Sequence, residues 1–326
     1  MARTIIAGVD TGNWKEKIVY SEVSKKKSEP KQISMRSAID LVDSDYPNAI
    51  TCASQFSHWN NQSWIDCSDG DEEVMNIENG KAHFALPVLI SAMWDVLKDG
   101  DNLKLAVSVP RKDLHGKSIE SALNGVHSFT CNGVTKRIDI EVLSTFHEGV
   151  GVILDERPQA KKVYLMEIGG GTINVSAFDK LKVLCDPYIA PNCGSRTLIN
   201  ELANCTEAVQ AVGKVGGLSK ETSVNILEKP GHTVSGLNNF SDFSSVVERE
   251  VHKWLDRVLP DLEKRTMQHL EQTDMKLASG GSCLIPAVRR YLEAKGFTIV
   301  SDPQWANAKG LHARAVWMFQ SQAEAA

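Results

Sequence analysis

The sequence lacks the long hydrophobic runs that membrane proteins need. No stretch approaches 18 uninterrupted apolar residues, and the opening MARTIIAGVD holds no apolar segment of secretory length. The most apolar segment, FALPVLISAMW at 84–94, has the length of a buried helix. We therefore expect a cytoplasmic protein with no membrane partner.

Paired cysteines and an excess of basic residues are lacking too. The seven cysteines are an odd number, no two have C-x-x-C spacing, and no histidine pattern completes a zinc site. Free thiols in a reducing compartment are therefore expected. The formal net charge of −5 argues against direct binding of nucleic acid, and the one dense basic group, at 25–27 and 31, is interpreted as a solvated loop.

Two common phosphate-binding motifs are also missing. There is no G-x-x-x-x-G-K-[ST] loop, and no G-x-G-x-x-G opens a helix after the first predicted strand. What the sequence has is an ordinary globular composition, 42% hydrophobic and 24% charged. Its 326 residues are enough for about two domains or one two-lobed fold.

Hydrophobic patterning predicts strand hairpins that alternate with helices, twice over. Strands are expected at 4–10, 17–23, 103–110, 126–144 (a hairpin turning at Asn132-Gly133), 162–168, 172–179, 182–189, 275–280 and 297–300. Helices are expected from 84 to about 98, from 111 to about 124, and at 144–156, 194–204, 219–229, 241–271, 285–296 and 307–322. This order predicts an α/β protein built from two related halves.

Three glycine-marked turns interrupt this pattern. They are Asp10-Thr11-Gly12-Asn13 with Lys17 just beyond, Glu167-Ile168-Gly169-Gly170-Gly171-Thr172, and Ser279-Gly280-Gly281-Ser282. Glycine permits positive φ and lets backbone N–H groups approach an anion, while an acidic residue at a strand end can hold Mg²⁺ through water. Taken singly, each turn is more typical of an ordinary hairpin.

The order and spacing of these turns carry a resemblance. VDTGN, STFHEGVG followed by MEIGGGTINV, and LASGGSCLIPAV resemble the nucleotide-binding pattern of the actin, sugar-kinase and heat-shock-chaperone ATPase superfamily. The N-A-x-G of DPQWANAKGLHARA and the chain length are similar to the bacterial plasmid-segregation (ParM-like) actins. The resemblance implies a two-lobed, ribonuclease-H-like α/β fold that binds ATP or GTP with Mg²⁺ in the cleft between its lobes.

The resemblance also implies a division into lobes. Lobe I would comprise 1–155, with an insertion at about 24–82 lying on its surface and outside its main sheet, and a C-terminal helix at about 303–326 would return to it. Lobe II would comprise 156–302, with an insertion at about 205–260.

Residue roles follow from the same resemblance. Asp10 and Glu167 would hold Mg²⁺, in part through water. Glu148, in the helix expected at 144–156, would orient or activate the attacking water, and Glu167 would share in catalysis. Phosphates would contact Thr11, Gly12, Asn13 and the Gly169–Thr172 turn, while Gly280, Gly281 and Ser282 would face the α-phosphate, ribose and base. Lys17 either reaches a phosphate or lies on the strand surface.

The sequence departs from the superfamily at two acidic positions. Glu167 and Asn174 stand where Asp is usual, and a misplacement of about 1 Å is costly in a reaction that depends on positioning. The leading hypothesis is a filament-forming ATPase that drives plasmid DNA segregation through a DNA-binding adaptor on a centromere-like site. The alternatives are a sugar or small-acid kinase of the same fold, and a nucleotide-dependent scaffold that does not hydrolyse.

Overall fold

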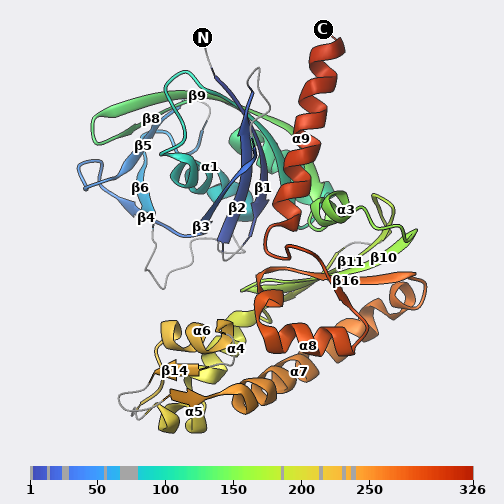
Figure 1. Cartoon of the computed structure of the whole chain (residues 1–326). Coiled ribbons are helices and arrows are strands. Elements are labelled where there is room, and N and C mark those ends of the chain that lie inside the picture. Colours follow the sequence, from blue (N-terminus) through green and yellow to red (C-terminus); the bar gives the residue numbers. More distant parts are fainter. Residues whose placement is uncertain are drawn as a thin grey trace. The chain divides into compact units, whose positions relative to one another are not determined.

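The fold is seen in a computed structural model that describes residues 3–12, 15–23, 29–54, 57–66, 80–184, 187–212, 216–229, 233–235 and 240–325 (Figure 1). The chain forms two compact units. One is Met1–Arg157 with Asn307–Ala326, and the other is Pro158–Ala306. Each unit has its own sheet and its own hydrophobic core.

The first unit is built on a nine-stranded sheet. Its strands are β1 (Thr4–Thr11), β2 (Lys15–Glu22), β3 (Lys31–Arg36), β4 (Ile39–Val42), β5 (Ile50–Ala53), β6 (Ser63–Asp66), β7 (Asn102–Val109), β8 (Gly125–Cys131) and β9 (Val134–His147). They lie in the order β3-β2-β1-β7-β9-β8-β5-β6-β4. β7 runs parallel to both β1 and β9 and lies between them in the interior of the sheet.

Helices cover both faces of this sheet, which is why its central strands are apolar on both sides. The helices are α1 (Gly80–Met93), α2 (Lys112–Leu123), α3 (Val150–Glu156) and α9 (Ala306–Ala325). On β1, Ile5 and Val9 belong to the main core with residues of α1, whereas Ile6 packs with Leu311 and Ala315 of α9. The strand therefore faces α1 and α9 with alternate residues.

The prediction that 24–82 lies outside the main sheet is wrong for its described part. β3 pairs with β2, and β5 pairs with β8, so β3 to β6 extend the sheet at both edges. The indoles of Trp59 and Trp64 are buried in the same core. These edge strands are polar because one of their faces meets solvent, and that composition resembles a surface insertion.

The helix expected at 144–156 is also shorter than predicted. β9 continues to His147 because residues 144–147 pair in parallel register with β7, and α3 begins only at Val150. Gly149 makes the change of direction in the left-handed region, with φ of 84°. Glu148 therefore lies in a turn between strand and helix rather than within a helix.

The second unit has a six-stranded sheet. Its strands are β10 (Lys162–Ile168), β11 (Thr172–Asp179), β12 (Lys182–Val183), β13 (Tyr188–Pro191), β16 (Met275–Ser279) and β17 (Thr298–Ile299), in the order β12-β11-β10-β16-β17 with β13 also on β11. The single strand expected at 182–189 is thus two short strands that pair with different parts of β11.

Helices and one small hairpin complete this unit. They are α4 (Ser195–Ala203), α5 (Thr206–Ala211), α6 (Lys220–Glu228), β14 (Thr233–Ser235), β15 (Phe240–Asp242), α7 (Ser244–Leu270), the 3₁₀ turn η2 (Gly281–Leu284) and α8 (Pro286–Ala294). Trp254 and Leu255 of α7 lie in the core of the unit. In Figure 1, the long orange helix α7 lies beside the shorter red helix α8.

Most of the remaining predicted elements are confirmed. Strands occur where they were expected at 4–10, 17–23, 103–110, 162–168, 172–179 and 275–280, and helices where they were expected at 194–204, 219–229, 241–271, 285–296 and 307–322. The predicted hairpin turn at Asn132-Gly133 has φ of 49° and 75°, as a type I′ turn requires.

The expectations about the cysteines and about membrane-spanning helices can be compared with the structure. The five cysteines in the described part of the chain, at 52, 131, 193, 205 and 283, are free thiols. Of the helices in the described ranges, none combines the length and the apolar character that crossing a bilayer demands.

Helix α9 packs against its neighbours through backbone-to-backbone contacts at glycine. A Cβ added at Gly310 would overlap the carbonyl oxygen of Gly151 in α3, and one added at Gly8 of β1 would overlap the backbone of His312. Such contacts leave no room for a side chain, so the start of α9 has a single register on α3 and β1.

We predict that Gly310→Ala lowers the free energy of unfolding by about 2–3 kcal/mol, because a methyl group there must push two backbones apart. The measurement is chemical denaturation followed by circular dichroism. Gly116→Ala in α2 is the matched control, since its Cβ would meet mainly the Thr145 hydroxyl. Equal effects of the two substitutions would show that the α3–α9 contact is not tight.

Candidate functional site

Asp10 lies at the end of β1 within a network of polar side chains. Its Oδ2 accepts a hydrogen bond from Lys17 Nζ at 2.6 Å, and its Oδ1 accepts from Asn307 Nδ2 at 3.0 Å and from Ser108 Oγ at 3.3 Å. Register explains the gathering, because Asp10 pairs with Lys17 on β2 and with Ser108 on β7. Asn307 joins this network from the first turn of α9.

The network keeps Asp10 ionised although it is buried. Burial by itself raises the pKa of the carboxyl group, but the charges of Lys17 and Lys81 and the hydrogen bond from Asn307 outweigh it and lower the pKa below its ordinary value. A fixed carboxylate at a strand end is the kind of group that orients Mg²⁺-bound water.

The hairpin after Asp10 is closed by its own backbone. Gly12 N donates to Asp10 O at 2.9 Å, and a Cβ on Gly12 would overlap the carbonyl oxygen of Lys15. Glycine is therefore needed here for close approach, and its φ is not in the left-handed region. The Thr11 hydroxyl donates to Ser108 O at 2.7 Å. The remaining residue of the motif, Asn13, lies outside the described residues.

Glu148 is fixed by its backbone and by one cation. Its N–H donates to Val109 O at 2.9 Å, and its Oε1 accepts from Lys81 Nζ at 2.5 Å. The side chains of this pair are only 13% and 9% exposed for lysine and glutamate respectively. Lys81 belongs to the first turn of α1, so the ion pair joins that helix to the end of β9.

A second acidic side chain, Glu16, is buried near these charges. It lies on β2 next to Lys17, is 1% exposed, and neither carboxyl oxygen has a hydrogen-bond partner among the described residues. Burial and the negative charge of Asp10 raise its pKa to about 8, against a smaller lowering by Lys81. Glu16 is therefore mostly protonated at neutral pH.

In the second unit, the triple-glycine turn between β10 and β11 directs its carbonyl groups toward α4. Gly169 O accepts from Ser195 N at 3.0 Å, Gly170 O accepts from Arg196 N at 2.9 Å, and Gly171 O accepts from Gly194 N at 3.3 Å. In a trans peptide, the next N–H points opposite to the carbonyl group. The amides that follow these three carbonyls therefore face away from α4.

The physical reason for the glycines differs from the predicted one. A Cβ on Gly169 would make only an ordinary contact with Thr172 O, and this residue does not have positive φ. At Gly194, however, a Cβ would overlap the carbonyls of Gly169 and Gly170. The turn packs so closely on the start of α4 that no side chain fits at Gly194.

Glu167 lies just before this turn, at the end of β10. It pairs with Asn174 on β11 and with Ser279 on β16, so these three side chains lie on one face of the sheet. The Glu167 carboxyl group is near enough to Cys283 for its charge to raise the pKa of that thiol, after the larger effect of burial.

The third turn packs on the second. Gly280 has φ of 97°, and a Cβ there would overlap the backbone of Ile168, so only glycine fits. Ser282 Oγ donates to Gly169 O at 3.1 Å, which ties η2 to the triple-glycine turn. A Cβ on Gly281 would meet open space, so this residue borders the free side of the turn.

The structure thus brings the candidate residues together in two groups, one within each unit. The first holds Asp10, Thr11, Gly12, Lys17 and Glu148, and the second holds Glu167, Gly169, Gly170, Gly171, Thr172, Gly280, Gly281 and Ser282.

Sequence reasoning missed four polar residues of the first group: Glu16, Lys81, Ser108 and Asn307. Two of them could have been found from the sequence. Ser108 lies two residues before Pro110, where the predicted strand ends, and Asn307 is the first residue of the N-A-x-G segment. Lys81 had none, because the helix was expected to begin at Phe84.

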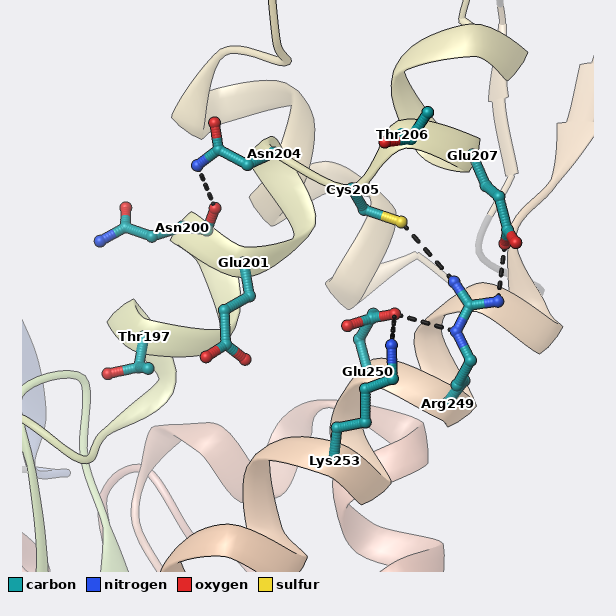
Figure 2. Close-up of a pocket in the computed structure, with 10 residues that line it drawn as sticks. All are labelled: Thr197, Asn200, Glu201, Asn204, Cys205, Thr206, Glu207, Arg249, Glu250 and Lys253. Atoms are coloured by element: carbon teal, nitrogen blue, oxygen red, sulfur yellow. Dashed lines mark hydrogen bonds and ion pairs between the residues drawn. The ribbon is translucent and has the colours of Figure 1, made fainter.

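A separate groove lies on the second unit between α4, α5 and α7 (Figure 2). Four of its charged side chains pair with one another: Arg249 donates to Glu207 at 2.7 Å and to Glu250 at 2.9 Å, and Lys253 donates to Glu250 at 3.0 Å. The fifth, Glu201, accepts from Arg257 at 2.6 Å. None of the candidate residues from the sequence lines this groove.

Comparison with solved structures identifies the fold. An archaeal actin homolog, Ta0583, matches with a TM-score of 0.73 and 16% identity over 96% of this chain and 99% of that chain. The chain therefore has the two-lobed α/β fold of the actin-like ATPases, as the resemblance implied.

The ParM proteins are among the structures with this fold. Bacillus thuringiensis ParM with ATP matches with a TM-score of 0.68 and 17% identity, over 98% of this chain and 99% of that one. The complex of Ta0583 with ADP matches with a TM-score of 0.70 and 16% identity, over 96% of this chain and 99% of that chain. No protein-family model and no curated protein sequence matches the chain. At these identities, the shared property is the fold.

The buried Glu16 makes a prediction about pH. The carboxyl group has a pKa of about 8 in the folded protein and an ordinary value of 4.5, so the folded state holds one more proton between these values. Stability should therefore fall as the pH rises from 4.5 to about 8, and Glu16→Gln should remove this fall. We expect the variant to gain at least about 1 kcal/mol relative to the natural protein between pH 5 and pH 8.

The measurement is urea denaturation at several pH values. Glu141→Gln is the control, because that side chain is 48% exposed on the same sheet. Curves for Glu16→Gln and the natural protein that run parallel over this range would contradict the assignment of a protonated Glu16.

Proposed function

We propose that the protein is a nucleotide-dependent, filament-forming ATPase that binds ATP or GTP with Mg²⁺. The observation that carries the proposal is the triple-glycine turn, whose carbonyls bind to the start of α4 and whose following amides face the other way. In a fold shared with a ParM solved with ATP, such an amide face is suited to the β- and γ-phosphates.

The residues present fit such a ligand. Asp10 is an ionised carboxylate at a strand end, and Lys17 beside it can contact a phosphate by leaving its present partner. Gly169 to Thr172 would bind phosphate oxygens, and Gly280, Gly281 and Ser282 would border the α-phosphate and nucleoside.

A metal ion at this site would depend on water. In the described ranges, no three His, Cys, Asp or Glu side chains gather as direct ligands. Mg²⁺ usually keeps several waters and binds one or two carboxylates together with substrate phosphates. Asp10 and Glu167 are the carboxylates that we assign to it, each acting largely through water.

Hydrolysis then requires a residue that orients the attacking water, and we assign this role to Glu148. Phosphoryl transfer depends on positioning and on stabilisation of charge, which bound Mg²⁺ supplies together with Lys17 and the turn amides. The backbone of Glu148 is held by the hydrogen bond from its N–H to Val109 O and by the left-handed conformation of Gly149. The side chain therefore extends from a fixed position.

We further propose that nucleotide binding favours addition of subunits and that hydrolysis loosens the filament. Such a filament needs head-to-tail contacts that do not close into a ring. With a net charge of −5, the chain is suited to reach plasmid DNA through a DNA-binding adaptor on a centromere-like site rather than by direct contact.

A second candidate is a scaffold that binds nucleotide without hydrolysing it. The observation that favours it is the pairing of Glu167 with Asn174, at two positions where the superfamily usually has Asp. A longer carboxylate beside an amide changes the reach and the charge of the metal site.

Light scattering and phosphate release, followed in parallel over a series of protein concentrations, test these proposals. A filament-forming ATPase should scatter on addition of Mg-ATP or Mg-GTP only above a threshold concentration, and the signal should decay as phosphate appears. Scattering without phosphate would favour the scaffold. Turnover that needs a sugar or small acid as second substrate would point to a kinase.

Glu148→Ala gives a sharper prediction. It should lower phosphate release at least about 100-fold because the water is no longer positioned, while nucleotide affinity and the onset of scattering are retained. The filaments of this variant should therefore persist. Glu141→Ala, on the strand β9 that precedes Glu148, is the control, with normal turnover expected. Normal phosphate release by Glu148→Ala would remove this residue from the mechanism.

A further inference from the structure

The link between β3 and β4 is a tightly constrained point of the first unit. These strands are the two edges of its nine-stranded sheet, yet only Ser37 and Ala38 separate them along the chain. Even a fully extended chain spans at most about 11 Å from Arg36 to Ile39, so the two edges of the sheet come close together here. Ser37, Ala38 and Ile39 are each 1% exposed. The link is therefore buried, with little freedom to move.

The side chain of Ser37 joins this link to the turn at the end of β1. Its Oγ donates a hydrogen bond to Gly12 O at 2.6 Å, between residues that are 25 positions apart. A serine hydroxyl has one proton to donate, and this buried one is given to the backbone of the Asp10-Thr11-Gly12 turn. The turn is thus anchored to the edge of the sheet as well as to its interior.

The other hydrogen bonds of the turn fix the residues before this carbonyl group. Gly12 N donates to Asp10 O at 2.9 Å, and the Thr11 hydroxyl donates to Ser108 O at 2.7 Å. The carbonyl group of Gly12 follows them, on a residue type with unusual backbone freedom. Its oxygen carries partial negative charge, so a carbonyl turned toward a polyphosphate would repel it. The hydrogen bond from Ser37 holds that oxygen at the edge of the sheet.

We propose that Ser37 is a positioning residue for phosphate binding, because it holds the Gly12 carbonyl in the orientation that lets the turn accept the β- and γ-phosphates. The inference rests on the proposed nucleotide-dependent function and adds a residue from outside the three glycine motifs. Ser37 acts through Gly12 rather than by touching the nucleotide.

Ser37→Ala tests the proposal by removing the donor. The KM and the Kd for Mg-ATP should rise about tenfold, while kcat at saturation stays within about twofold, since Glu148 keeps its own backbone hydrogen bond to Val109. The affinity for AMP should not change, because its single phosphate is assigned to the Gly280 turn of the second unit. Calorimetry gives the two affinities, and phosphate release gives KM and kcat.

A rescue and a control separate positioning from mere stability. Ser37→Thr keeps the hydroxyl group and should bind Mg-ATP within about threefold of the natural protein. Ser63→Ala is the matched control, because Ser63 is a 5% exposed serine of the same sheet whose hydroxyl pairs with that of Thr51 at 2.8 Å. Its affinity for Mg-ATP should be normal.

Thermal unfolding shows which variants are folded. Where Ser37→Ala is not, Ser37→Cys replaces it, since a thiol is a weak donor of similar size, and a loss of about threefold in Mg-ATP affinity is expected. Unchanged Mg-ATP affinity, or an equal loss for AMP and Mg-ATP, would overturn the role of Ser37 and leave nucleotide binding standing. A natural protein that does not bind Mg-ATP would overturn the proposed function and this inference together.

Discussion

The register between β1 and β7 is the constraint on which the first unit depends. It sets Asp10 opposite Ser108 and, through the antiparallel β2, opposite Lys17. A shift of one residue would turn the carboxylate to the other face of the sheet, away from its ammonium partner. The apolar residues that alternate with Asp10 along β1 pack under α1, so burial of the core and placement of the carboxylate are fixed by the same pairing.

In the second unit, the comparable constraint is backbone packing rather than charge. Gly194 and Gly280 allow the start of α4 and the η2 turn to pack directly on the triple-glycine hairpin. Three peptide groups are thereby oriented together, without any charged side chain. The candidate residues of the first unit are therefore held by charge, and those of the second unit are held by packed peptide groups.

Much of this could be predicted from the sequence, and the failures have physical causes. The apolar strands that end in Asp10 and Glu167 were predictable because burial on both faces leaves a continuous hydrophobic run. The edge strand KQISMR was not, because solvent on one face gives it the composition of a loop. Residues 144–147 were misassigned to a helix since their pairing with β7 is a contact distant in sequence.

The candidate site divides in the same way. The glycine motifs are local, so they could be found, whereas Lys81 and Asn307 reach the site from elements that only tertiary structure brings near. Even for the glycines, the predicted reason of positive φ holds at Gly280 and not at Gly12 or Gly169. Sequence therefore located the turns better than it explained them.

The hydrogen bond from Asn307 to Asp10 has a consequence for biosynthesis. These residues are 297 positions apart, and Asn307 belongs to a helix that the ribosome makes only after the entire second unit. The nascent first unit has Asp10, Lys17 and Ser108 but neither the amide of Asn307 nor the cover that α9 gives to β1. The polar network around Asp10 is therefore completed only after the second unit has been translated.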